Sequence, residues 1–196
     1  QDGLLTLQDE SAMLPVEALQ ITTQVKTVLD AAAAPGGKTT QIAQYIADDA
    51  TITALDIHAH KIRLIEANAK RLHVSDKITA QVLDARQTAN QLTTKFDRIL
   101  VDAPCSGFGL LRRKPEIRYD KTLEDVMSLA SLQGEILDSV SQNVADNGMI
   151  VYSTCTILRQ ENDDVIARFL SKHTDFELVP TMTSKALKSN RQARKS

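Results

Sequence analysis

Short apolar runs alternate with longer amphipathic segments through most of this chain. The runs at 26–30, 51–56, 78–83, 96–102 and 149–153 predict strands, and a weaker one lies at 176–179. The segments between them predict helices over 39–47, 59–72, 122–144 and around 165–170. Strands that alternate with helices in this way are typical of βαβ units. We therefore expect an α/β fold with a mostly parallel sheet and helices on both faces.

The length of 196 residues suits a single domain. We expect this domain to occupy residues 1–180, with residues 1–20 leading into it. Residues 181–196 are polar and basic without a clear period, and we expect this tail to be disordered. Because the chain begins at Gln1 rather than at Met, we expect it to be a fragment of a longer protein.

The charges are nearly balanced, with 23 Lys and Arg against 25 Asp and Glu and a net charge of −2. This balance disfavours a globally basic nucleic-acid-binding protein and leaves a local basic patch open. Four Phe, three Tyr and no Trp offer few surfaces for base stacking, which disfavours modules that read bases in that way. No apolar run approaches the roughly 20 residues that cross a bilayer, so we expect no membrane partner.

Two cysteines, Cys105 and Cys155, are too few for a disulfide scaffold or a zinc site of four cysteines. The histidines show no metal-ligand spacing, so we expect no metal. This cysteine usage suits a reducing compartment, and we expect a cytoplasmic protein. We favour a monomer, although no sequence feature decides the oligomeric state.

An aspartate stands at the end of each of the first four predicted strands. These residues are Asp30, Asp56, Asp84 and Asp102. Ligands of open α/β sheets bind beyond the carboxyl ends of the strands, so we expect the four carboxylates to converge on one crevice. The alternative for any one of them is a helix cap.

The loop after the first predicted strand consists of small residues. Gly36 and Gly37 permit a tight turn, and the helix that follows offers free N–H groups to a ligand. A nucleotide P-loop is one alternative because residues 37–39 match its second half, but Ala32 replaces its first glycine and Pro35 removes an N–H group.

S-adenosylmethionine is the other candidate ligand for this loop. Its amino-acid end would meet the glycine turn and Lys38. Asp56, at the end of the next strand, would bind the ribose hydroxyls as an acid does in dinucleotide sites. Asp84 would reach the adenine edge. We favour this ligand over the nucleotide.

The two cysteines follow neighbouring predicted strands, so we expect both thiols over the same crevice. A thiolate is a strong nucleophile, and a nearby cation or helix N-terminus lowers its pKa. The alternative is that each cysteine is a small buried apolar residue. The adjacent Asp102 and Pro104 favour a functional role.

The motifs together resemble the RNA cytosine-5 methyltransferases. The resemblance rests on Ala32-Ala-Ala-Pro-Gly-Gly-Lys38-Thr, Asp102-Ala-Pro-Cys-Ser-Gly107, Ser153-Thr-Cys155-Thr and the later pair Glu161-Asn162. The stretches Gln8-Asp-Glu-Ser-Ala-Met13, Ala54-Leu-Asp-Ile-His58 and Leu111-Arg-Arg-Lys-Pro-Glu-Ile-Arg-Tyr119 are similar to the bacterial Sun/Fmu branch, which acts on 16S ribosomal RNA. The likeness extends from about Gln8 to Val179.

The resemblance implies a Rossmann-like, S-adenosylmethionine-dependent methyltransferase fold. It implies cofactor contacts from Ala32, Ala33, Ala34, Pro35, Gly36, Gly37, Lys38, Asp56, Asp84 and Asp102. Two departures stand out. Ala32 occupies a position where the family usually has Cys, and neither an N-terminal RNA-binding domain nor a final strand near the C-terminus is visible in the sequence.

The implied chemistry is covalent catalysis, because carbon 5 of cytosine is a poor nucleophile until a thiolate adds to carbon 6. The residues alone do not rank the two cysteines. The resemblance makes Cys155 the nucleophile and gives Cys105 a role in product release. Asp102 would hydrogen-bond the Watson–Crick edge of the target base.

RNA contacts are predicted just after the catalytic loop. The target base must leave its stack, and Phe108 is the nearest aromatic side chain that could stack on it; simple loop packing is its alternative. A basic cluster of Arg112, Arg113, Lys114 and Arg118 would meet phosphates, and a solvated surface is its alternative.

Three other functions remain as alternatives. Methylation of an exocyclic amine is disfavoured because Cys105 follows Pro104 where that class usually has a second proline. A fragment that binds the cofactor but is inactive without its RNA-binding domain is the second alternative. A P-loop-like nucleotide hydrolase is the third.

Overall fold

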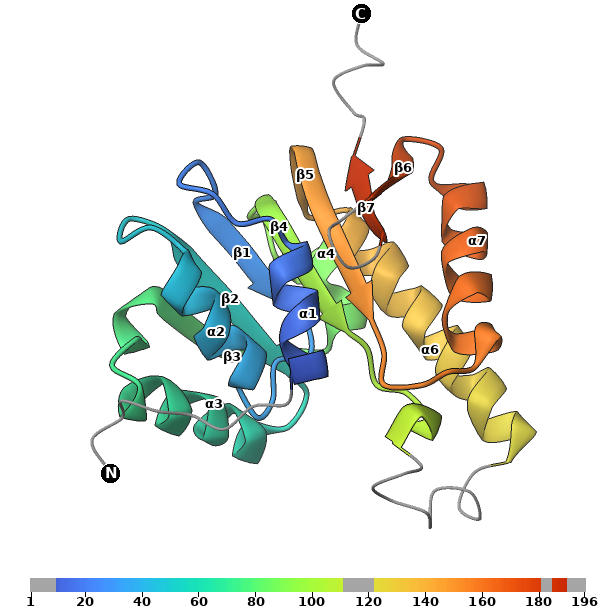
Figure 1. Ribbon diagram of the computed structural model, residues 1–196, viewed down its shortest axis with the longest axis horizontal. Coiled ribbons are helices and arrows are strands. Elements are labelled where there is room, and N and C mark those ends of the chain that lie inside the picture. The colour runs from blue at the N-terminus through green and yellow to red at the C-terminus, as the bar shows by residue number, and fades with distance from the viewer. Residues whose placement is uncertain (1–9, 111–121, 181–184, 190–196) are drawn as a thin grey trace, which may run out of the picture.

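A computed structural model of the chain describes residues 10–110, 122–180 and 185–189. Within them, the strands form one sheet in the order β3-β2-β1-β4-β5-β7-β6 (Figure 1). They are β1 (Thr27–Asp30), β2 (Thr51–Asp56), β3 (Ile78–Val82), β4 (Phe96–Asp102), β5 (Val144–Ser153), β6 (Phe176–Pro180) and β7 (Lys185–Ser189). β1 to β5 pair in parallel, whereas β7 is antiparallel to both β5 and β6. The structure confirms the predicted α/β fold with a mostly parallel sheet.

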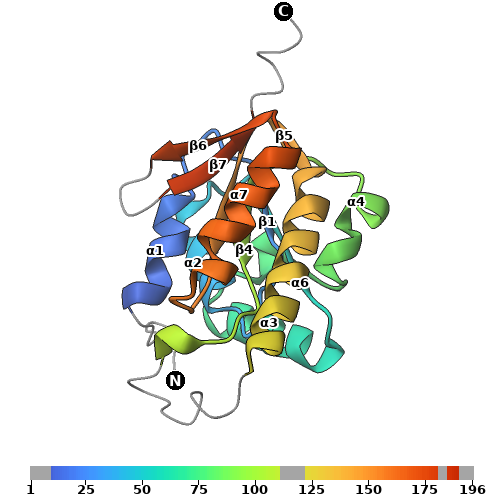
Figure 2. The ribbon, with the colours of Figure 1, turned by 90° about the vertical axis from the view of Figure 1, so that its right-hand side faces the viewer.

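Helices cover both faces of the sheet (Figures 1 and 2). α1 (Glu10–Ala18), α2 (Gly37–Tyr45) and α3 (Ala59–Arg71) lie on one face. α4 (Thr88–Gln91), α6 (Leu123–Ser141) and α7 (Asp163–Lys172) lie on the other. No helix in the described ranges is long and apolar enough to span a membrane.

Alternate residues of the central strands supply the two apolar cores. Val28 and Leu100 pack with α1 and α2, whereas Leu29, Ile99 and Val101 pack with α6 and α7. This follows from strand geometry, because successive side chains point to opposite faces of a sheet. All five side chains are fully buried, as expected for a parallel sheet covered on both sides.

The predicted helix over 122–144 is three residues too long at its end. It begins with a capping box, in which the Asp125 N–H donates to the Thr122 hydroxyl and the Asp125 carboxylate accepts from the Thr122 N–H. It ends at Ser141, because Val144 already pairs with Phe96 as the first residue of β5. Leu123, predicted on the buried face, is 70% exposed.

The prediction of a disordered tail is wrong for residues 185–189. This segment is β7, with Leu187 opposite Ile150 of β5 and opposite Leu178 of β6. A sheet edge presents unpaired backbone N–H and C=O groups, and a polar segment can satisfy them without an apolar pattern of its own. A strand near the C-terminus, which is not visible in the sequence, is therefore present. The rest of the tail lies outside the described residues.

The strand order changes direction between β1 and β4, since β2 and β3 extend to one side of β1 while β4 and β5 extend to the other. Loops from the carboxyl ends of β1 and β4 diverge at such a switch point. The crevice between them is the usual ligand site of an open α/β sheet.

Candidate active site

A cavity of about 390 Å³ opens beyond the carboxyl ends of β1, β2 and β4. Its wall brings together three of the predicted carboxylates, Asp56, Asp84 and Asp102, with both cysteines. Asp30 does not join them. It is only 1% exposed and receives a hydrogen bond from the Thr39 hydroxyl at 2.7 Å, beneath the first loop. The expectation of four converging carboxylates is therefore wrong for Asp30, which β1 buries.

The first loop presents alanines to the cavity. Ala31, Ala32 and Ala34 line it, whereas Ala33 is buried and donates its N–H to the Leu55 carbonyl at 2.8 Å. Pro35, Gly36, Gly37 and Lys38, which were predicted to contact the cofactor, do not line the cavity. Small side chains on this wall keep the backbone open to a ligand.

Gly36 is needed for the turn itself. Its φ angle of 102° lies in the left-handed region. A Cβ atom there would approach the Ile65 Cα of α3 to 3.1 Å. Glycine therefore allows this loop to pass close to α3 before α2 begins.

The loop does not have the contacts of a nucleotide P-loop. The Lys38 ammonium is bound to Asp102 at 2.7 Å, and the Thr39 hydroxyl donates to Asp30. The Gly36 N–H donates to the Ala33 carbonyl at 2.7 Å. The groups that would hold phosphates and magnesium in a P-loop are thus engaged within the protein.

Asp102 is held from two sides at the end of β4. Its Oδ2 accepts from Lys38, and its Oδ1 accepts from the Ser153 hydroxyl at 2.8 Å. Ser153 ends the neighbouring strand β5, directly opposite Asp102 in the sheet register. The carboxylate is therefore fixed in orientation while still facing the cavity.

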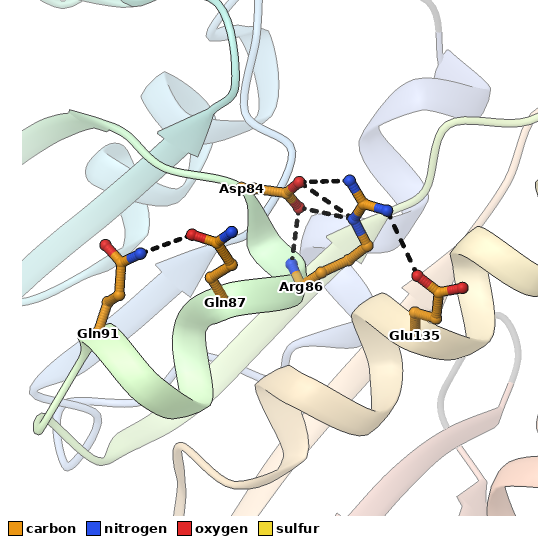
Figure 3. A network of polar contacts seen from close by, with 5 residues as sticks. All are labelled: Asp84, Arg86, Gln87, Gln91 and Glu135. Carbon is orange, nitrogen blue, oxygen red and sulfur yellow. Dashed lines mark hydrogen bonds and ion pairs between the residues drawn. The ribbon is translucent and has the colours of Figure 1, made fainter.

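Asp56 and Asp84 each organise the loop that follows their strand. The Asp56 Oδ1 accepts from the His58 N–H at 2.9 Å, and the Lys61 ammonium lies 3.7 Å from its Oδ2. Asp84 accepts from the backbone and guanidinium of Arg86, and the hydrogen bond to that side chain lowers the pKa of Asp84 (Figure 3).

Arg86 also connects the third strand end to α6. Its Nη1 lies 3.4 Å from Glu135 Oε2, so one guanidinium joins two carboxylates (Figure 3). Further residues line the cavity that the sequence did not predict there, among them Lys61, Arg86, and Leu132 and Ile136 of α6. The spacing Asp84-x-Arg86 is the one signal that could have indicated the guanidinium.

The sulfur atoms of Cys105 and Cys155 lie 2.9 Å apart at the cavity wall. Both cysteines are free thiols, Cys155 is exposed, and its backbone N–H donates to the Cys105 sulfur at 3.2 Å. The thiol hydrogen bond from Cys105 lowers the pKa of Cys155 to about 7. The same contact and partial burial raise the pKa of Cys105. These opposite shifts favour a shared proton, with Cys155 as the thiolate and Cys105 as the thiol.

The predicted RNA contacts are only partly within the described structure. Phe108 begins the short 3-10 helix η3 (Phe108–Leu110) and is half-buried. The next residue, Gly109, donates its N–H to the Cys155 carbonyl at 3.0 Å. Arg112, Arg113, Lys114 and Arg118 lie outside the described residues.

The cavity has the chemistry that S-adenosylmethionine requires. Its volume falls in the range of small-molecule sites, and alanines form the wall beside the β1 loop. Asp56 stands at the end of the strand next to that loop, where an acid binds ribose hydroxyls in related α/β sites. Asp102 places a negative charge where a sulfonium cation would be favoured.

The chain is similar to two proteins of Pyrococcus horikoshii whose structures are solved. The chain is similar to NSun6 of Pyrococcus horikoshii, solved with SFG, at 31% identity and a TM-score of 0.83, covering 92% of this chain and 45% of that one. It is also similar to a methyltransferase homologue of the same organism at 32% identity and a TM-score of 0.80, covering 92% and 55%. The fold is that of the S-adenosylmethionine-dependent methyltransferases, and the cofactor of this class is S-adenosylmethionine.

Sequence similarity identifies the family of this chain within that class. A profile of the family described as 16S rRNA methyltransferase RsmB/F matches residues 17–195, and the chain belongs to this family. It is 47% identical over 178 residues to the probable ribosomal RNA small subunit methyltransferase B of Bacillus subtilis, covering 90% of this chain and 39% of that protein. It is 41% identical over 186 residues to the corresponding protein of Photorhabdus laumondii, covering 94% and 42%. The chain therefore spans about two fifths of the length of these relatives.

Proposed function

We propose that this chain is the catalytic domain of an enzyme that methylates carbon 5 of a cytosine in 16S ribosomal RNA. The observation that carries the proposal is the contact between the Cys105 and Cys155 thiols at the cavity wall, beside Asp102. Methylation of an exocyclic amine needs no thiol, whereas addition to carbon 6 of a pyrimidine needs a thiolate. The curated relatives named above are ribosomal RNA methyltransferases, which supports RNA as the substrate.

Cys155 is the nucleophile in this proposal. Its sulfur is exposed, and the thiol of Cys105 stabilises it as a thiolate near neutral pH. Addition of the thiolate to carbon 6 moves an electron pair toward carbon 5 of the base. S-adenosylmethionine, when bound, supplies the electrophilic methyl group.

Cys105 acts after methyl transfer. While Cys155 is a thiolate, loss of the Cys105 proton would place two negative charges 2.9 Å apart. Once the Cys155 sulfur is bonded to carbon 6, that charge is gone and Cys105 can release its proton to solvent. The Cys105 thiolate then takes the proton from carbon 5, and the carbon–sulfur bond to Cys155 breaks.

Asp102 orients the target base. Its two oxygens already accept from Lys38 and Ser153, but a carboxylate has about four lone-pair sites. The remaining sites can accept from the exocyclic amine of cytosine. Lys38 and Ser153 act through Asp102 by fixing its orientation.

Two variants test this division of roles on 16S ribosomal RNA with methyl-labelled cofactor. We expect Cys155→Ser to abolish both methylation and any covalent complex. We expect Cys105→Ala to accumulate a protein–RNA adduct that survives on a denaturing gel. Methylation by Cys155→Ser, or an adduct that forms with Cys155→Ser and not with Cys105→Ala, would reverse the assignment.

A cofactor-binding measurement beside the methylation assay tests the inactive-fragment alternative. If this chain binds S-adenosylmethionine by calorimetry but does not methylate RNA, the remainder of the longer protein supplies RNA recognition.

The basic cluster at Arg112, Arg113, Lys114 and Arg118 stays a prediction for phosphate binding. Neutralising three of these residues should lower the salt dependence of RNA affinity, and an unchanged dependence would refute the prediction.

A further inference from the structure

A buried carboxylate lies directly behind the loop that carries Cys105. Glu161 is 0% exposed and accepts hydrogen bonds from the Ser106 N–H at 2.9 Å and from the Ser106 hydroxyl at 2.5 Å. It also accepts from the Gln133 amide at 3.0 Å, and that amide donates to the Pro104 carbonyl at 2.9 Å. Of the residues on the two sides of Cys105, Ser106 is therefore attached to Glu161 directly and Pro104 through Gln133.

The next residue in the chain holds the other cysteine loop in the same way. The Asn162 Oδ1 accepts from the Thr154 hydroxyl at 2.7 Å. Its amide Nδ2 donates to the Thr156 carbonyl at 3.1 Å. Thr154 and Thr156 flank Cys155, so Asn162 attaches both neighbours of the second cysteine.

One contact joins the two halves of this network. The hydroxyls of Ser106 and Thr156 lie 3.0 Å apart, and both residues are buried. Glu161 and Asn162 are consecutive, so their separation is set by a single peptide unit. The two cysteine loops are thus attached to one short piece of backbone at the end of the 3-10 helix η4 (Arg159–Glu161).

We propose that Glu161 and Asn162 are positioning residues, each holding the loop that carries one cysteine, and that together they set the distance between the two thiols. Neither residue lines the cofactor cavity, so they act through the cysteines. The catalytic role of the two thiols rests on the proposed function, whereas the control of the distance between them does not.

A carboxylate suits this position because hydrogen bonds to an ionised acceptor are stronger than those to a neutral one. Glu161→Gln keeps the size of the side chain and one acceptor oxygen but replaces the other oxygen with a donor. Asn162→Asp keeps the acceptor for Thr154 and removes the donor to Thr156. Both changes weaken the attachment without opening a large cavity.

Disulfide closure measures the thiol separation without RNA or methyl transfer. The oxidant is diamide: one thiolate adds to its nitrogen–nitrogen double bond, and the other thiol displaces the resulting hydrazine to form the disulfide. Both thiol protons end on the two nitrogens. The chain contains only Cys105 and Cys155, so an intramolecular disulfide must join them.

We expect the full chain to close rapidly and reversibly, and Glu161→Gln and Asn162→Asp to close about tenfold more slowly or worse. Ser106→Ala removes the hydroxyl that contacts both Glu161 and Thr156 but keeps the backbone N–H bond to Glu161, so it should show a smaller decrease. Glu66→Gln and Asn90→Asp are matched controls on exposed helix positions and should close at the wild-type rate. S-adenosylmethionine affinity should stay within about twofold in every folded variant, because none of the substituted side chains lines the cavity.

A merely structural role gives a different result. In that case the variants melt at lower temperature, yet the folded protein closes its disulfide at the wild-type rate, and this outcome would overturn the proposal. If Glu161→Gln does not fold, the closure rates of Ser106→Ala and Asn162→Asp decide in its place. Slow closure in the variants, together with no RNA methylation by the wild-type chain, would support the positioning role while the proposed function fails.

Discussion

The sulfur atoms of Cys105 and Cys155 are 2.9 Å apart although 50 positions separate the residues in the chain. Their proximity follows from the sheet, because Asp102 of β4 lies opposite Ser153 of β5 in a parallel pair. Each strand ends there, and its loop carries a cysteine within the next three residues. Parallel pairing of two neighbouring strands therefore places both thiols at one edge of the sheet.

The reactivity of the exposed thiol should show this contact directly. We expect iodoacetamide to alkylate Cys155 with a rate that rises with pH around a midpoint near 7, since its pKa is lowered to about 7. The largest cause is the hydrogen bond from Cys105, so Cys105→Ala should move the midpoint upward. Mass spectrometry of samples quenched across pH 5–10 measures both midpoints, and an unchanged midpoint in Cys105→Ala would contradict the shared proton.

Asp56 should contribute to cofactor affinity. Loss of a hydrogen bond to a charged group costs about 1.5–3 kcal/mol, so Asp56→Ala should weaken S-adenosylmethionine binding by about 10- to 100-fold. Calorimetric titration measures this change. Asp49→Ala is the control, because Asp49 pairs with Lys26 on an exposed surface away from the cavity. Equal affinities of the two variants would exclude Asp56 from the site.

The ion pair of Asp84 and Arg86 should tune the charge of the cavity wall. Asp84→Asn leaves the guanidinium without its bidentate partner and should weaken binding of the cationic cofactor by about 3- to 10-fold at low salt. Arg86→Gln should strengthen it. The double variant should return toward the wild-type affinity, because the two changes cancel. A double variant that binds as weakly as Asp84→Asn would contradict this compensation of charge.

The strands and the crevice could be predicted because their signals are local. The runs at 51–56 and 96–102 correspond residue for residue to β2 and β4. The small residues of the first loop and the aspartates after the strands indicated where a ligand binds. Such patterns depend on neighbouring residues alone.

The features that could not be predicted depend on residues far away in the sequence. β7 forms because β5 and β6 offer unpaired backbone groups, and nothing within residues 185–189 indicates this. The ion pair of Arg86 with Glu135 forms because the fold places α6 beside the end of the third strand. Glu161 was visible as part of a motif, but its contacts with Ser106 and Gln133 require the folded chain.

Asp30 provides a test of stability against pH. Burial raises its pKa from 3.8 to about 6, and the hydrogen bond from Thr39 opposes that shift only in part. The folded state therefore holds a proton that the unfolded state releases, and the stability it contributes is complete below pH 3.8 and lost as pH rises through about 6. Asp30→Asn keeps an acceptor for Thr39 and removes the titration. Thermal unfolding at pH 4.5 and 7.5 should show a decrease in wild-type stability larger than in Asp30→Asn by about 2 kcal/mol, and parallel pH profiles would show that this carboxyl titrates normally.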